Sequence, residues 1–462
     1  MARAKKETAL TPEERLQAAL VPDWEWPYKL PENWCWTTVG VINQYVGISA
    51  DPTKAKNETF ELYSVPSSAD NYPEIVLGAD IGSTKQAVKK GDVLLCKINP
   101  RINRVWKVSK YTDHSLLASS EWIVVRNSRL ISNYLMWCFR SPYFRGYMLS
   151  NVSGVGGSLM RAQPKFVQGY PVPVPPLAEQ QRIVDRIESL FAKLDEAKEK
   201  AQAVVDSFET RKAAILHKAF TGELTAKWRE EHGVGMESWE KRRINELARP
   251  RAGYAFDSKE FSNTGYQVVR MGNLYGETLD LFRKPVFISE DDVDDSILNR
   301  ALIKDGDILI TLTGTKYKRD YGYAVCVSSP NKLLVNQRIL CLTPFACVER
   351  NYLLYYLKSN LFRDVFFSCE TGGVNQGNVS SKFVENIEIP IPTFDEQLEI
   401  TTVLDRTLAH EQQAKEAAEA VLDQIELMKK SILARAFRGE LGTNDPSEEG
   451  AVELLKEIIR RG

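Results

Sequence analysis

The chain repeats one of its own segments, and this repeat limits the possible folds more than any other feature. The heptapeptide KAFTGEL at residues 218–224 returns as RAFRGEL at residues 435–441. Extended backwards without a gap, residues 176–224 align on residues 393–441, and 20 of the 49 aligned positions are identical. Such a period is too long for a solenoid, whose repeats are roughly 20 to 50 residues. The sequence therefore predicts two copies of one domain, each followed by the same connecting segment.

The segments before each connector also correspond, with small gaps. GDVLLCKI from Gly91 matches GDILITLT from Gly306, and NYLMWCFRSPYFR from Asn133 matches NYLLYYLKSNLFR from Asn351. We therefore predict a tandem duplication. Its parts are an N-terminal arm (1–33), a first globular domain (34–175), a central helix (176–222), a linker (223–237), a second globular domain (238–392), a distal helix (393–441) and a C-terminal tail (442–462).

The connector has the pattern of a long amphipathic helix. Its apolar residues recur every three or four positions, as at Ile187, Leu190 and Leu194. Each helix covers roughly 38 to 42 residues, or about 60 Å. A helix with one apolar stripe needs a partner, and the other copy supplies it in an antiparallel coiled coil. Gly222 and Gly439 follow the last turns and are expected to cap them. The charged outer face of these helices has two possible roles: it is exposed to solvent, or it is a docking surface for another subunit.

Short β-rich runs alternate with short helical runs inside each globular half. DVLLCKI, EWIVVRN, DILITLT and RILCLTP have the composition of strands, whereas ISNYLMWCFRS and NYLLYYLKS have that of helices. The predicted fold class is α+β. Two tandem mixed α/β domains with mostly antiparallel sheets are separated and joined by two long helices, which are shared between the copies and form the antiparallel coiled coil.

Composition excludes several classes of protein. The chain is 43% hydrophobic, and its 60 basic and 61 acidic residues leave a formal net charge of −1, so it is globular but not coated with positive charge. A local basic face remains compatible with that balance. Seven scattered Cys and four dispersed His predict reduced thiols and no metal site. Without an apolar run of signal-peptide or membrane-span length, we expect a cytoplasmic protein.

Basic and aromatic residues gather in the loop after each GD strand. Residues 85–110 contain eight Lys or Arg against Asp92 alone, with Trp106 and Tyr111 among or beside them. The matching loop of the second half, TLTGTKYKRDYGY at residues 311–323, holds two Lys and one Arg among three Tyr. Such loops suit phosphate contact and the reading of base edges. One loop alone would be assigned to a solubilising surface, but two at matching positions favour nucleic acid.

A glycine-rich loop precedes each proline-rich strand: SGVGGSLMRAQ at residues 153–163 and TGGVNQGNVSS at residues 371–381. Such loops can approach a ligand closely, but neither is a G-x-x-x-x-G-K-[ST] motif, and a plain mobile loop is the simpler interpretation. The candidate DNA-binding residues in the basic and glycine-rich loops and their surroundings are Lys85, Lys89, Lys90, Lys97, Arg101, Arg104, Lys107, Ser158, Arg161, Arg270, Asn273, Thr315, Lys316, Tyr317, Lys318, Arg319, Gln376 and Asn378.

The sequence lacks the motifs of the enzymes that act on DNA. An S-adenosylmethionine-dependent base methyltransferase needs [ND]-P-P-[YF], and NPRI at Asn99 lacks both the second proline and the aromatic residue. PDWE at Pro22 is not followed by the E-x-K of a nuclease motif, and there is no Walker motif. We therefore expect no catalytic residues, no metal and no cofactor in this chain.

Two unlike globular halves, each followed by a near-identical long helix, resemble the specificity (S) subunit of a Type I restriction–modification system. The resemblance covers nearly the whole chain and rests on PVPVPPLAEQQRIVDRIESLFAKLD from Pro171 and ILARAFRGEL from Ile432. The second copy departs from the pattern at its strand-to-helix junction, where PTFDEQLEI from Pro392 replaces a full PPLAEQ.

The resemblance implies that each half is a target recognition domain for one half of a split DNA sequence, with the helices setting the separation. The implied partners are double-stranded DNA, two modification (methyltransferase) subunits and restriction (translocase/nuclease) subunits, with no membrane. S-adenosylmethionine, ATP and Mg would be used by those partners and not by this chain. The alternatives are a non-enzymatic scaffold for protein partners and the DNA-binding subunit of another methyltransferase-based defence system. A methyltransferase fused to a recognition domain would need the motif that is missing.

Overall fold

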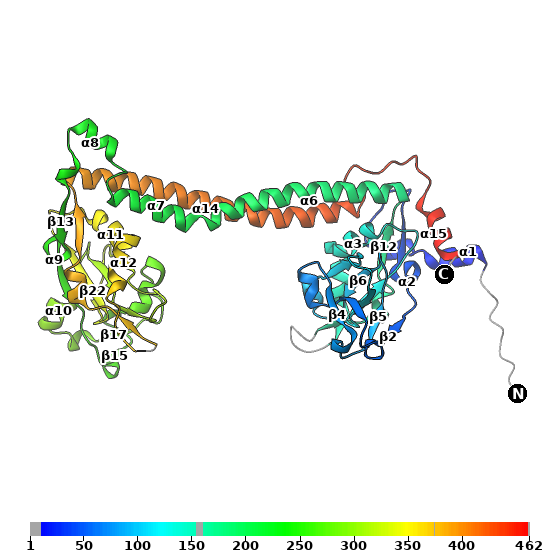
Figure 1. Ribbon diagram of the computed structural model, residues 1–462, viewed down its shortest axis with the longest axis horizontal. Coiled ribbons are helices and arrows are strands. Elements are labelled where there is room, and N and C mark those ends of the chain that lie inside the picture. The colour runs from blue at the N-terminus through cyan, green and yellow to red at the C-terminus, as the bar shows by residue number, and fades with distance from the viewer. Residues whose placement is uncertain (1–10, 154–159, 374, 461–462) are drawn as a thin grey trace. The chain divides into compact units, whose positions relative to one another are not determined.

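A computed structural model describes residues 11–153, 160–373 and 375–460 (Figure 1). Contacts between residues divide the chain into two compact units. Unit 1 contains Met1–Ala201 and Ala420–Gly462, and unit 2 contains Gln202–Glu419. Each unit therefore combines one globular half with a stretch of both long helices, and the two units are described separately.

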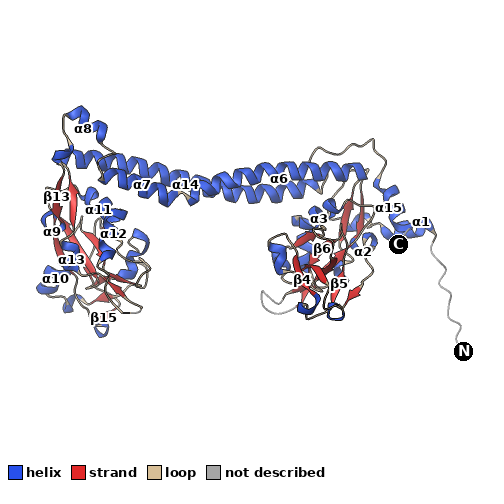
Figure 2. Cartoon of the chain, viewed as in Figure 1, coloured by secondary structure: helices blue, strands red, loops and turns tan. Residues whose placement is uncertain are grey.

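Unit 1 contains two main sheets (Figure 2). The larger has the strand order β2-β5-β8-β3-β4 and the smaller the order β7-β6-β9. All neighbouring strands in them are antiparallel except β3 and β8. The bounds are β2 (Ser49–Ala50), β3 (Thr59–Tyr63), β4 (Glu74–Leu77), β5 (Lys85–Ala87), β6 (Val93–Cys96), β7 (Val105–Lys107), β8 (Ser115–Ala118) and β9 (Trp122–Val125). The runs DVLLCKI and EWIVVRN are thus confirmed as strands.

The remaining elements of unit 1 flank these sheets. Two further antiparallel pairs join β1 (Cys35–Thr38) to β12 (Pro171–Val174) and β10 (Val152–Ser153) to β11 (Arg161–Ala162). The short helices are α1 (Pro12–Ala19), α2 (Val39–Ile42), α3 (Ser132–Arg140), α4 (Pro142–Ser150), α5 (Pro164–Val167) and α15 (Ala451–Arg460). Helix α15 lies in the predicted C-terminal tail, and its Leu455 is buried in the same core as Ala19 of α1.

Unit 2 repeats this plan. Its sheets have the orders β14-β22-β18-β20 and β15-β17-β16-β21. Strand β16 is antiparallel to β17 and parallel to β21, just as β3 is antiparallel to β4 and parallel to β8. The bounds are β14 (Ala248–Ala252), β15 (Phe261–Ser262), β16 (Tyr266–Val269), β17 (Phe287–Ile288), β18 (Ile308–Thr311), β20 (Ala324–Cys326), β21 (Leu333–Val335) and β22 (Ile339–Pro344). The shared topology confirms the duplication expected from the repeat.

Two further strand pairs and six short helices complete unit 2. The antiparallel pairs join β13 (Glu240–Arg243) to β24 (Glu388–Ile391) and β19 (Thr313–Gly314) to β23 (Gly377–Asn378). The short helices are α8 (Ala226–His232), α9 (Ile244–Leu247), α10 (Asp295–Ala301), α11 (Arg350–Lys358), α12 (Asn360–Ser368) and α13 (Ser381–Glu385). The expected helical runs ISNYLMWCFRS and NYLLYYLKS are confirmed as α3 and α11.

The two connectors are long helices, but they differ in continuity. The first copy forms α6 (Leu177–Asp206) and α7 (Phe208–Phe220) with a break at Ser207, whereas the second is the single helix α14 (Phe394–Ala436). The sequence predicted one continuous helix in each copy. Ser207 donates its hydroxyl to the carbonyl of Ala203, four residues back, and a side chain that bonds the preceding turn in this way tends to bend a helix.

Within each unit the helices pack antiparallel. In unit 1, Lys198 Nζ lies 2.9 Å from Glu426 Oε1, and Asp195 pairs with Lys429. In unit 2, Arg211 Nε lies 2.6 Å from Glu411 Oε2. In unit 1 the partner number falls as the helix number rises, which is the signature of an antiparallel pair. Gly222 and Gly439 have φ of 82° and 75°, so both adopt the left-handed conformation expected of helix-capping glycines.

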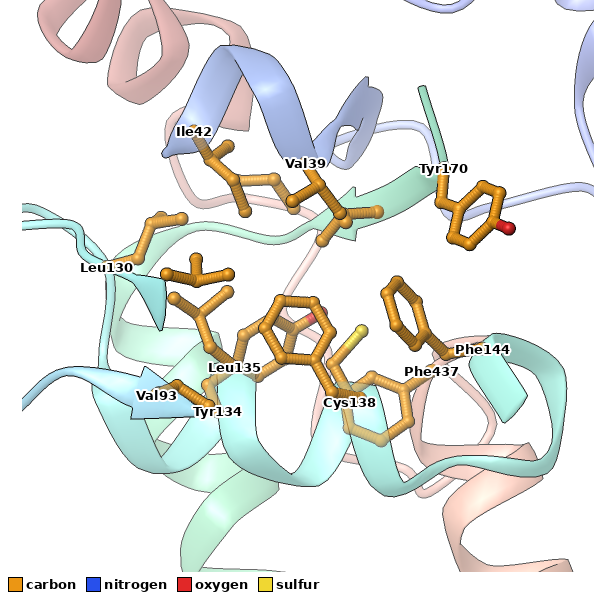
Figure 3. Close-up of a cluster of buried hydrophobic side chains, with 14 of the residues drawn as sticks. Val39, Ile42, Val93, Leu130, Tyr134, Leu135, Cys138, Phe144, Tyr170 and Phe437 are labelled. Carbon is orange, nitrogen blue, oxygen red and sulfur yellow. The ribbon is translucent and has the colours of Figure 1, made fainter. Parts of the chain in front are cut away.

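The phenylalanine of each AFxGEL sequence is a core residue of the globular domain beside it. Phe437, directly after α14, is fully buried among side chains of unit 1 (Figure 3). Its ring centroid lies 5.4 Å from that of Tyr134 on α3. In unit 2, Phe220 lies 5.3 Å from Tyr352 on α11. Each globular domain is thus held against the end of the helix that belongs to the other copy.

Candidate nucleic-acid interface

The GD dipeptides fix the start of the strand that leads into each basic loop. Gly306 adopts φ of 82°, a conformation that glycine reaches without a steric cost. Asp307 is buried, accepts a 2.8 Å hydrogen bond from the Lys304 N–H and forms an ion pair with Arg251. Asp92 makes the corresponding contacts in unit 1. The repeated GD sequence is therefore structural, and it positions the residues that follow.

In unit 2 the basic loop and the glycine-rich loop lie side by side. Strand β19, in the basic loop, pairs with β23, in the glycine-rich loop. Lys316 Nζ donates a 3.0 Å hydrogen bond to the carbonyl of Gly372, and the N–H of Tyr317 donates a 3.2 Å bond to Glu370 Oε2. Two segments more than fifty residues apart in sequence therefore form one surface.

An open cleft of about 440 Å³ adjoins these loops. Besides the two loops, its walls come from the segment after β16 and from the residue before β22. Its lining includes Met271, Tyr275, Arg283, Thr315, Arg338 and Gln376. Arg283 and Arg338 are exposed, and among the described residues neither forms an ion pair with a carboxylate. Two guanidinium groups without carboxylate partners make the cleft suitable for phosphates or for the acceptor edges of bases.

The candidates of unit 2 occupy different positions. Thr315 and Gln376 line the cleft, Tyr317 is 81% exposed and Lys318 is exposed. Arg319 is paired with Asp364 at 2.9 Å. Asn378 lies in β23 beside the cleft, and Arg270 donates to the carbonyl of Lys284 at 2.5 Å. Asn273 is buried, so its side chain shapes the loop and does not reach a ligand.

The basic loop of unit 2 is held by carboxylates. Asp320 Oδ1 accepts the N–H of Thr315 at 2.7 Å. Burial opposes ionisation of Asp320, but hydrogen bonds from Thr315 and from its own backbone, together with the charge of Lys318, hold the pKa of this carboxyl below its ordinary value. Tyr321 is buried and donates to Glu370 Oε1 at 2.8 Å, and burial raises its pKa above the ordinary range. Asp320 is thus ionised and Tyr321 neutral at pH 7, which suits a preformed loop.

Unit 1 places the residues after β6, where its basic loop begins, beside the end of its glycine-rich loop. The N–H of Ala162 donates to the carbonyl of Lys97 at 2.9 Å, and the N–H of Asn99 donates to Met160 at 2.8 Å. Arg101 is exposed and Arg104 half-buried in the turn that follows. The corresponding β-bridge joins Ile98 to Arg161. This group of candidates therefore matches the arrangement in unit 2.

Lys85, Lys89, Lys90 and Lys107 of unit 1 do not join that group. Lys89 and Lys90 precede β6, whereas Lys97 follows it, so the strand separates them by about 13 Å. Lys85 Nζ donates to the Ser83 hydroxyl at 2.5 Å, and Lys107 Nζ donates to Asn133 Oδ1 at 2.5 Å. Arg161 forms an ion pair with Glu121 at 3.3 Å. Ser158 lies outside the described residues.

Sequence reasoning did not single out Met271, Tyr275, Arg283 or Arg338 of the cleft. The run LFRKP at residues 281–285, an aromatic residue followed by two cations, was a usable signal for the segment after β16. Arg338 is a single cation between Gln337 and Ile339 and carried no such signal. In the described part of the chain, no cluster of three His, Cys, Asp or Glu is arranged to hold a metal ion. The described helices also include none that could cross a membrane.

Comparison with known proteins agrees with this arrangement. Residues 236–420 match the family described as the Type I restriction modification DNA specificity domain. The chain is 27% identical over 330 residues to the EcoKI specificity subunit of Escherichia coli strain K12, which covers 69% of this chain and 68% of that protein. It is 22% identical over 471 residues to the Escherichia coli EcoAI specificity subunit, with 83% and 79% covered.

A solved structure shares the fold. The HsdS subunit from Thermoanaerobacter tengcongensis superposes with a TM-score of 0.63 at 22% identity, covering 90% of this chain and all of that one. Together with the sequence matches, this confirms the resemblance that the repeated motifs predicted.

Proposed function

We propose that this chain, as a specificity subunit of the Type I restriction–modification family with a DNA recognition domain at residues 236–420, reads a bipartite DNA site. Each globular domain reads one half of that site. The observation that carries the proposal is the cleft of unit 2. Arg283 and Arg338 line it beside Tyr275 and Gln376. Guanidinium and amide groups are the side chains that pair with guanine and adenine edges in the major groove.

The surrounding lysines supply affinity without sequence information. Lys316 and Lys318 lie on the loop beside the cleft, and Lys97 and Arg101 lie at the corresponding place in unit 1. Contacts of this type neutralise phosphates, release counterions and fix the register of the protein on the duplex. The roles are assigned by position: Arg338 and Gln376 of the cleft discriminate bases, whereas Arg283 on the cleft wall and the cations of the rim hold the DNA backbone.

The long helices have the shared role in this proposal. They are alike in both copies, whereas the loops are not, so they set the distance between the half-sites and dock two modification subunits. Restriction subunits would join the same complex. S-adenosylmethionine, ATP and Mg belong to those partners, and this chain contributes no catalytic group. The complex would act in the cytoplasm on double-stranded DNA.

Methylation-sensitive sequencing of DNA from the source cell tests the proposal. The expected result is a two-part methylated motif that disappears when the gene for this chain is deleted and returns when it is restored. Restoration with a chain carrying R338A should return a motif degenerate at one base of one half. A motif that survives deletion of this chain would contradict the proposal.

A further inference from the structure

The segment after β16, residues 270–286, forms one wall of the cleft of unit 2 and presents an exposed aromatic residue. We propose that it is a second DNA-contacting element, in which Phe282 acts as an apolar wedge against the duplex while Arg283 and Lys284 contact phosphates. The inference rests on the proposed function of unit 2 as a DNA reader. It adds that residues 270–286 contact the DNA through an apolar ring and two cations, and that this contact deforms the duplex.

Phe282 is 94% exposed, the highest value among the large exposed hydrophobic side chains in the described part of the chain. Tyr275 in the same segment is 58% exposed. A single exposed apolar residue is common on protein surfaces and implies nothing by itself. The conformation of the segment and the charges beside Phe282 are what distinguish this one.

The segment is held in one conformation by a buried amide. Asn273 is 3% exposed, and its Nδ2 donates to the carbonyls of Asp280 at 2.8 Å and Arg283 at 3.0 Å. Its Oδ1 accepts the N–H of Arg270 at 2.9 Å, so one side chain ties both ends of the segment together. Asp280 Oδ1 accepts the N–H of Phe282 at 3.0 Å. The phenyl ring is therefore presented on a fixed backbone, and binding costs little ordering entropy.

The two residues after Phe282 are cations, and one of them lines the cleft. Arg283 is exposed, lies in the cleft lining and stands over the Tyr275 ring at 5.7 Å. Lys284 is exposed and adopts φ of 47°, in the left-handed region, two residues after the wedge. The segment also carries the acids Glu277 and Asp280, but Asp280 is engaged with the Phe282 N–H. A phenyl ring followed by cations fits duplex DNA, in which apolar wedges enter base steps while cations contact the backbone.

Unit 1 has no equivalent. The corresponding connection between β3 and β4, residues 64–73, contains no Lys or Arg and carries Asp70. Its Asn71 has φ of 52°, close to that of Lys284, so the turn is retained without the cations. The aromatic residue beside this turn, Tyr72, is 49% exposed and packs on the Tyr111 ring at 4.8 Å, so its ring is engaged within the protein. The inference therefore assigns DNA deformation to the half-site read by unit 2 alone.

The experiment uses the full-length chain and duplexes that carry the methylated motif identified above. 2-Aminopurine is placed at each step of the half-site assigned to unit 2, since its fluorescence rises when a base unstacks. The variants are F282A, F282L and the double variant R283A/K284A. The matched control is F345A. Phe345 is 40% exposed, and it follows the last residue of β22, whereas Arg338 of the cleft precedes the first. Affinity is measured by fluorescence anisotropy across a series of salt concentrations.

We expect F282A to weaken binding about tenfold, to abolish the fluorescence rise and to leave the salt slope unchanged, because a neutral ring releases no counterions. F282L should retain part of the rise. R283A/K284A should retain the rise and lower the salt slope by about two. F345A should match the unsubstituted chain.

Two results would overturn the inference. In the first, F282A and F345A show the same affinity and the same fluorescence, while K316A/K318A still weakens binding. This result would overturn the wedge and leave the proposed function intact. In the second, the unsubstituted chain binds the duplex with the motif no more tightly than a scrambled duplex. This result would contradict the proposed function as well.

Discussion

Thr225 Oγ1 donates a hydrogen bond of 2.7 Å to Glu396 Oε1, and both side chains are buried. The same relationship joins Thr443 to Glu179, also at 2.7 Å. Each threonine follows a GEL sequence, and each glutamate lies in the first turn of a long helix. The repeat is thus explained by contact, because the segment after each GEL docks on the helix that begins the other copy's connector.

The first prediction concerns the free energy of unfolding of the two units. Glu396 is paired with Arg229, whose side chain is 8% exposed, so E396A should leave a buried charge unpaired at a cost of about 3–5 kcal/mol. E179A should cost less, about 1 kcal/mol, because Arg182 is 36% exposed and retains Glu448 at 2.7 Å. Urea denaturation of each variant measures the difference.

The control for this pair is E196Q. Glu196 forms an exposed ion pair with Lys200 on the same helix, so E196Q should change the unfolding free energy by only about a few tenths of a kcal/mol. If E396A and E179A lowered the unfolding free energy equally, burial of the partner arginine would not determine how much stability is lost.

The second prediction is a pH dependence of unit 1. Burial raises the pKa of Glu179 above its ordinary value, although hydrogen bonds from Thr443 and Arg182 oppose the shift. The folded state therefore binds a proton more tightly than the unfolded state, so unfolding free energy falls as pH rises through the raised pKa. E179Q should flatten this fall. Denaturant midpoints of both proteins at a series of pH values from about 4 upward provide the measurement, and parallel curves would contradict the assignment.

The third prediction tests the packing of the helix end on the globular domain. Phe437 is fully buried against Tyr134, so F437A should lower the unfolding free energy by about 3–5 kcal/mol. F394A is the control, because Phe394 at the start of α14 is 44% exposed and should cost under about 1 kcal/mol. A thermal transition unaffected by F437A would mean that the domain does not depend on this contact.

The sequence was sufficient to predict the duplication, the strands β6, β9, β18 and β22, and the capping glycines, because each has a local signal. The break at Ser207 had none, since the apolar period continues through it. Residues 442–462 were predicted only as a C-terminal tail. Burial of Leu455 makes α15 part of the core that also contains Ala19, a tertiary contact that has no local signal.

The candidate site was predictable in part for a similar reason. Clusters such as Lys316 and Lys318 are visible in sequence, and the structure places them on one loop. Lys107 belongs to the same kind of cluster but donates to Asn133, a contact that depends on tertiary packing. Asn273 looked like a polar contact residue, yet its amide is used inside the protein. Arg338 reaches the cleft because β21 and β22 bring it there, which no local pattern reveals.

The fourth prediction concerns the rim cations of unit 2. K316A/K318A should reduce the dependence of log affinity on log salt by about two, one for each phosphate that the lysines no longer neutralise. R319A should add less, because Arg319 already shares its charge with Asp364. Lys259 lies on the same unit outside the cleft lining, and K259A serves as control. An unchanged salt slope in K316A/K318A would exclude this loop from the DNA contact.

The last prediction concerns modularity. Strand β13 pairs with β24, and Gln397 of α14 accepts the N–H of Glu349 at 2.8 Å while donating to the carbonyl of Pro392 at 3.0 Å. The strand pair closes the domain on itself, and the contacts of the domain with the long helices, through Gln397 and through the Phe220 ring on Tyr352, recur in unit 1 at Gln180 and Phe437. Residues 238–392 should therefore be exchangeable as a block for those of a related subunit.

This exchange should change one half of the methylated motif and leave the other half and the spacing unaltered, because unit 1 and the helices keep their sequence. Exchange of residues 34–175 is the reciprocal control and should change only the other half, since Gln180 accepts the N–H of Ile131 at 3.0 Å in the corresponding way. Methylome sequencing of both chimaeras provides the measurement. If one exchange altered both halves, base reading would depend on contacts shared between the domains, and the assignment of one reader to each unit would be wrong.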